Sequence, residues 1–104
     1  MSGLLDRLGS KIESWRDIQQ HECTKDQAAF LPYYSEIIEA LIDARSEVQA
    51  ISTNVEPQLL YDQLLAFAEE LENRWQAEMR PNECRGRAEG YREAMGIIRW
   101  FLDV

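Results

Sequence analysis

Apolar residues recur at intervals of three and four along most of this chain, a spacing that places them on one face of an α-helix. The first stripe lies within residues 2–21 and consists of Leu4, Leu5, Leu8, Ile12, Trp15 and Ile18. The second stripe lies in a helix that we expect to begin at Pro32 and consists of Tyr34, Ile37, Ile38, Leu41, Ile42, Arg45, Val48 and Ile51. The third lies in a helix expected from about Pro57 to about Met79 and consists of Leu60, Leu64, Phe67, Leu71 and Trp75. The pattern predicts helices and no strand.

Prolines and polar capping residues mark the expected ends of these helices. Thr24, with Gln27 three residues later, matches a capping box, and the backbone before a proline is disfavoured from helix, so a short helical turn should end at Leu31. The segment STNVEPQ (residues 52–58) is the clearest loop. Pro81 ends the third helix.

A last helix is expected over about 83–102. Its apolar residues step by four and three in alternation, which is the spacing of a long helix–helix contact: Cys84, Ala88, Tyr91, Met95, Ile98 and Leu102. The four segments predict an all-α fold in one domain over residues 1–104. We expect a compact bundle of three long helices plus a shorter first or connecting helix, with antiparallel neighbours.

Two glycines in the last helix share one of its faces. Gly86 and Gly90 are four residues apart, and each costs about 1 kcal/mol relative to alanine inside a helix. The usual compensation is the close approach of another backbone. That backbone belongs either to the first or third helix of this chain or to another chain, and the sequence leaves both open.

The end of the last helix is apolar on almost all sides, through Ala94, Met95, Ile97, Ile98, Trp100, Phe101 and Leu102. Such a helix is either central in its domain or covered by another molecule. We therefore take Gly86, Gly90, Ile97, Trp100 and Phe101 as candidates for a subunit interface, which predicts a homo-oligomer.

Three arginines, Arg85, Arg92 and Arg99, follow one another at intervals of seven on the same helix. With Glu89 they form either a solvated, salt-bridged face or a stripe that docks onto an acidic segment of a neighbouring copy.

The length of 104 residues, with 45% hydrophobic and 29% charged residues, is typical of a globular domain. No apolar run approaches the roughly 18 residues of a membrane span, and the start MSGLLDRLGSKIESW is too charged for a signal peptide. We therefore expect an intracellular protein that contacts no membrane. In that setting Cys23 and Cys84 should be free thiols.

The formal net charge of −8 is concentrated in residues 31–73, which hold nine acids and one base. This field disfavours nucleic acid as a direct partner and attracts a basic protein surface. Glu36, Glu39, Asp43 and Glu47, which we call the acidic ridge, step by three, four and four along the second helix. The ridge either improves solubility only or recognises a basic partner.

Signatures of catalysis are weak. His21 is the only histidine, and the chain lacks both a zinc-ligand pattern and a phosphate-binding loop. Glu36-x-x-Glu39 and Glu69-x-x-Glu72 could hold Mg²⁺ if their helices were neighbours. This pairing resembles the helical MazG-type nucleotide pyrophosphohydrolases, although Glu72 stands where those enzymes have aspartate. Two solvated acidic faces are the favoured interpretation, so we predict no metal, no cofactor and no enzymatic activity.

The closing sequence ECRGRAEGYREAMGI resembles the ends of small acidic helical proteins of tailed bacteriophages, through Arg85-Gly86-Arg87 and the segment 90–94. The resemblance covers about 20 residues. It implies a non-enzymatic virion or assembly protein, in the host cytoplasm or in the virion, that self-associates through its C-terminal helix. The alternative is a phage-encoded inhibitor whose acidic ridge occupies a basic groove of a host nucleic-acid-binding protein.

Overall fold

The computed structural model describes residues 2–22, 31–78 and 86–103, which form four helices and, within these ranges, no strand. The helices are α1 (Ser2–Glu22), α2 (Leu31–Asn54), α3 (Pro57–Glu78) and α4 (Gly86–Leu102). The predicted all-α class is confirmed, and α2 begins one residue before the proline at which we expect it.

The helix lengths differ from the expected arrangement. With 21 residues, α1 is about as long as α2 and α3, and α4 is the shortest with 17, so a shorter first helix is not confirmed. The predicted helical turn from Thr24, the stop at Pro81 and both cysteines lie outside the described residues.

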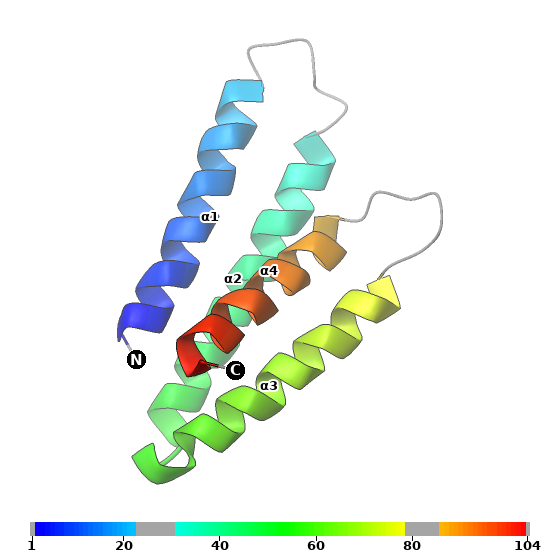
Figure 1. Cartoon of the computed structure of the whole chain (residues 1–104). Helices are drawn as coiled ribbons and strands as arrows, with labels where there is room; N and C mark the ends of the chain where they lie inside the picture. The colour runs from blue at the N-terminus through cyan, green and yellow to red at the C-terminus, as the bar shows by residue number, and fades with distance from the viewer. Residues whose placement is uncertain (1, 23–30, 79–85, 104) are drawn as a thin grey trace.

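Successive helices run in opposite directions, and α4 runs in the same direction as α2 (Figure 1). From the short connection at Val55 and Glu56, α2 and α3 diverge (Figure 1), and α4 packs extensively against both of them. By contrast, α1 packs mainly on α2 and makes fewer contacts with α4. The resulting molecule is elongated, with extents of 50 × 29 × 21 Å.

The predicted apolar stripes form the core. Its fully buried large side chains come from all four helices: Leu4, Leu8, Ile37, Leu41, Val48, Leu64, Leu71 and Ile98. Two stripe residues, Ile18 and Ile42, are instead exposed. Burial of each large apolar side chain contributes about 1.5–3 kcal/mol, so this shared core holds the helices together.

One polar residue within the second stripe stays inside the structure by reaching a backbone oxygen. The half-buried Arg45 of α2 donates from Nε to the Leu5 carbonyl oxygen of α1 at 3.1 Å. A long side chain at the edge of an apolar stripe can pack its methylene groups and still satisfy its charged end. This bond also joins α1 to α2.

Candidate protein-interaction surface

The face of α4 that carries Gly86 and Gly90 is occupied by α2 of the same chain. A Cβ atom at Gly90 would lie 2.6 Å from the Ala40 Cβ and 2.7 Å from the Ile37 carbonyl oxygen. One at Gly86 would lie 2.6 Å from the Glu36 Cβ. Neither α1 nor α3 makes this crossing, so that expectation is wrong. Both glycines are buried within the chain and are not open to a second copy in this arrangement.

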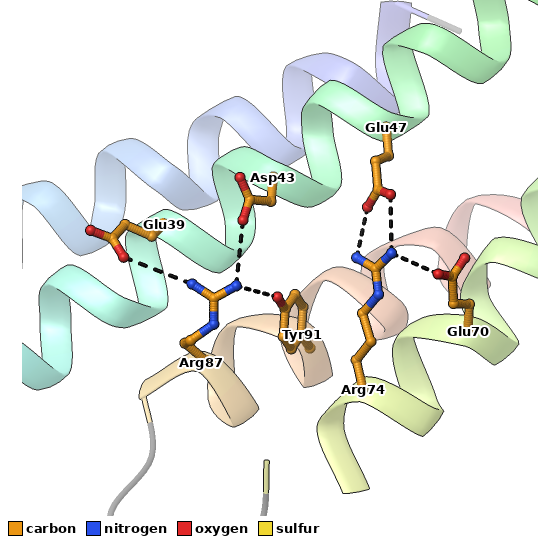
Figure 2. Close-up of polar contacts among 7 residues, drawn as sticks. All are labelled: Glu39, Asp43, Glu47, Glu70, Arg74, Arg87 and Tyr91. Carbon is orange, nitrogen blue, oxygen red and sulfur yellow. Dashed lines mark hydrogen bonds and ion pairs between the residues drawn. The ribbon is translucent and has the colours of Figure 1, made fainter. Parts of the chain in front are cut away.

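The acidic ridge lies along the side of α2 that faces α3 and α4 (Figure 2). Arg87 of α4 reaches two of its carboxylates, with Nη1 3.8 Å from Glu39 Oε2 and Nη2 3.5 Å from Asp43 Oδ2. The same guanidinium donates a hydrogen bond to the hydroxyl of Tyr91, whose ring is buried. An arginine of the same chain therefore neutralises part of the ridge.

A second arginine, Arg74 of α3, spans the gap between α3 and the ridge. It donates to both carboxylate oxygens of Glu47, at 2.7 and 3.0 Å, and to Glu70 at 2.6 Å (Figure 2). The hydrogen bond to Glu47 is the main cause that raises the pKa of Arg74 above its ordinary value, which favours the charged form of this arginine. The Glu70–Arg74 pair can be expected from the sequence, because residues four apart are neighbours on a helix surface. No sequence pattern indicates the contact between Arg74 and Glu47, which lie on different helices.

The remaining ridge carboxylate contacts the beginning of α4. Glu36 Oε2 accepts a hydrogen bond from the backbone N–H of Gly86 at 3.2 Å. A carboxylate at a helix N-terminus satisfies an otherwise free donor and interacts favourably with the helix dipole. All four ridge acids therefore have a contact within the chain.

The carboxylates of the hypothetical magnesium site serve separate contacts. Glu72 accepts a hydrogen bond from Arg99 at 3.0 Å, while Glu36 binds the N-terminus of α4. Among the described residues, no group of three or more histidine, cysteine or acidic side chains could hold a metal ion. The convergence that a nucleotide hydrolase of this type requires is thus not found there.

The arginine stripe of α4 also finds partners inside the chain. Arg92 pairs with Glu89 at 2.9 Å, as the spacing predicts, and Arg99 pairs with Glu72 of α3. Arg85 lies outside the described residues. These contacts match the interpretation of a salt-bridged face of a single chain.

The last turns of α4 place two aromatic residues at the surface. Trp100 is 61% exposed and Phe101 is 38% exposed, whereas Ile97 is half-buried. The guanidinium carbon of Arg7, on α1, lies 3.9 Å from the centre of the Trp100 ring. Although α4 touches all three other helices, its last turn is not fully covered, because Trp100 and Phe101 are exposed.

Trp100 and Phe101 stand at one end of an open groove between α1 and α4. Small residues line it, with Gly3, Ser10 and Ser14 on α1 and Gly96 on α4. A Cβ atom at Gly3 or Gly96 would meet no heavy atom of the described residues within 4 Å. We call this surface, with Arg7, Ile97, Trp100 and Phe101, the α1–α4 groove.

A half-buried carboxylate of α4 joins the two walls of the groove. Glu93 accepts a hydrogen bond from the Trp15 indole N–H and pairs with Lys11 Nζ at 3.5 Å. These contacts hold α1 beside α4 and leave the space above Gly96 open. Sequence reasoning missed the α1 wall and Gly96, although a third glycine in the last helix was a visible signal.

Comparison with protein-family models, curated proteins and solved structures finds no match for this chain. None of its described helices combines the length and apolar composition needed to cross a membrane.

Proposed function

We propose that this chain is a non-enzymatic protein that acts by protein–protein contact and self-associates through the end of its C-terminal helix, as a structural or assembly component. The observation that supports this is the exposure of Trp100, which at 61% is the most exposed large apolar side chain among the described residues. Ile97 and Phe101 extend the apolar surface beside it.

Tryptophan is among the side chains that contribute most at protein interfaces, because its large apolar area is buried while its ring can also bind a cation. The guanidinium of Arg7 lies over the Trp100 ring, and the pair forms a partly apolar edge of the groove. Covering this edge with a second protein removes apolar area from water, which drives association.

The phage setting rests on the closing sequence alone, of which residues 83–85 are outside the described structure. Within the proposal, the site of action is the virion or the host cytoplasm during assembly.

The first experiment is the solution mass by light scattering for the wild type and for the double variant Trp100→Glu/Phe101→Glu. We expect an oligomer for the wild type and a monomer of unchanged helical content for the variant, because the new carboxylates cannot be buried without partners. A wild type that is monomeric at every concentration contradicts self-association. An unfolded double variant would show instead that these rings are needed for folding.

A second candidate function is inhibition through the acidic ridge, because the side chains of Glu39 and Asp43 remain 65% and 58% exposed despite their contacts with Arg87. Against it, each ridge acid already has a partner within the chain.

The variant Glu39→Gln/Asp43→Asn separates the two candidates. The assembly function predicts an unchanged solution mass. Inhibition predicts that the wild type displaces a labelled DNA duplex from a basic DNA-binding protein, measured by fluorescence anisotropy, and that the neutral variant does not.

A further inference from the structure

The acidic charge of this molecule is concentrated on two of its four described helices. The helices α2 and α3 together carry nine acids and two bases, whereas α1 and α4 together carry six of each. Two copies that approach through α2 or α3 repel each other, because like charges meet at short range. Two copies that approach through α1 and α4 meet where the net charge of the helices is zero.

The glycines of α4 differ in the contacts that compensate for their cost to helix stability. Gly86 and Gly90 admit the backbone of α2, whereas the space above Gly96 is open. A glycine inside a helix weakens that helix relative to alanine, and at Gly96 no close contact with another described residue compensates for it. The close approach of a backbone from another molecule would compensate for it.

The walls of the groove carry charges of both signs. Asp6, Arg7 and Lys11 lie on α1, and Glu93 lies on α4. In a twofold contact the same patch meets itself, so it has to be complementary to its own rotated image. A patch with two acids and two bases can satisfy this condition. On α3 the exposed charged side chains, Asp62, Glu69 and Glu70, are all acidic and would repel their rotated images.

We propose that the partner of the α1–α4 groove is the α1–α4 groove of a second copy, related by a twofold axis that passes near Gly96 of both chains. The inference rests on the proposed self-association and adds to it the partner surface, the symmetry and the contribution of α1. At Gly96 the two α4 backbones approach closely, and Trp100 of each copy lies against the groove of the other.

The size of the surface suits such a dimer. The helix α1 has 21 residues and is about 30 Å long. Beside α4 it forms a face about 20 Å wide, which is comparable with the roughly 800 Å² that each partner buries in a stable interface.

The test is the solution mass by sedimentation velocity, over a range of concentrations, of the full chain and three variants. Gly96→Gln and Ser10→Gln each fill the groove from one wall, and both new side chains favour helix. Asn73→Gln places the same side chain on the exposed side of α3 and is the matched control. Far-UV circular dichroism shows that each variant is folded.

We expect dimers for the wild type and for Asn73→Gln, and folded monomers for Gly96→Gln and Ser10→Gln. A wild-type dimer that both groove variants preserve would overturn this inference and leave self-association through Trp100 intact. A wild type larger than a dimer would overturn the twofold arrangement. A wild-type monomer at every concentration would overturn the proposed self-association and this inference together.

Discussion

At the scale of single residues, identical amino acids in α4 have opposite surroundings. Gly90 faces Ala40 and the backbone of Ile37 so closely that a methyl group has no room, whereas Gly96 faces open space. The intrinsic cost of glycine in a helix is the same at both positions. Of these two glycines, only at Gly90 is this cost compensated within the chain, through the tight contact of α4 with α2.

We therefore predict that Gly90→Ala lowers the free energy of unfolding. The gain in helix propensity of up to about 1 kcal/mol is outweighed by overpacking, which costs about 1–3 kcal/mol in a dense core, and here part of the clash is with backbone. Gly9→Ala is the control, because its Cβ would meet Arg45 Nε at an ordinary 3.6 Å.

Urea denaturation at one protein concentration measures both variants. We expect Gly9→Ala to match or exceed the wild type by up to about 1 kcal/mol. A Gly90→Ala variant as stable as the wild type would mean that α2 and α4 separate easily.

At the scale of helices, α4 fills the space between α2 and α3, which touch each other little. Arg74 links these two helices, because it binds Glu47 of α2 and also lies over the rings of Phe67 and Tyr91. One side chain thus joins three helices. The acidic ridge that looks like a binding surface in the sequence is in part a structural element.

We predict that Arg74→Ala lowers the free energy of unfolding by about 1–2 kcal/mol. A charge-assisted hydrogen bond contributes about 1.5–3 kcal/mol when buried, and partial exposure of this pair reduces that contribution. The variant also leaves Glu47 and Glu70 without their shared cation.

Arg16→Ala serves as the comparison, since it removes an exposed pair with Glu13 within a single helix. Such pairs are worth about 0.5 kcal/mol or less. Thermal unfolding followed by circular dichroism compares the stability of the two variants. Equal losses of stability would show that the contacts of Arg74 contribute no more than an exposed ion pair.

At the scale of the whole molecule, the net charge of −8 opposes the association of two copies. The proposed dimer avoids the strongest repulsion by placing α2 and α3 of each copy on the outside. Its interface carries no net charge, so the remaining repulsion acts over a longer range through the solvent.

Salt should therefore strengthen the proposed dimer. Raising sodium chloride from about 0.02 M to about 0.5 M shortens the screening length from roughly 20 Å to less than 5 Å and removes most of the long-range repulsion. We expect the dissociation constant, measured by sedimentation equilibrium, to fall. A constant that rises with salt would indicate an interface built from ion pairs, such as the arginine stripe of one copy on the acidic segment of another.

The sequence by itself determined the helices and the faces they bury, because these follow from the period of the apolar residues and from local backbone preferences. The buried residues Leu4, Leu8, Leu64 and Ile98 all belong to predicted stripes. The glycine pair correctly indicated a close crossing. Trp100 in the apolar last turn is exposed, and its role in a subunit interface stays a prediction.

Only the tertiary structure decided which partners those faces meet. The crossing helix at Gly90 is α2, the partner of Glu47 is an arginine 27 residues away, and the wall opposite Gly96 comes from α1. Helical periodicity describes one helix at a time and contains no information on the rotation and order of helices around a common core. The pairing of charges and the openness of a groove depend on that arrangement, because both are set by distances between side chains that lie far apart in the sequence.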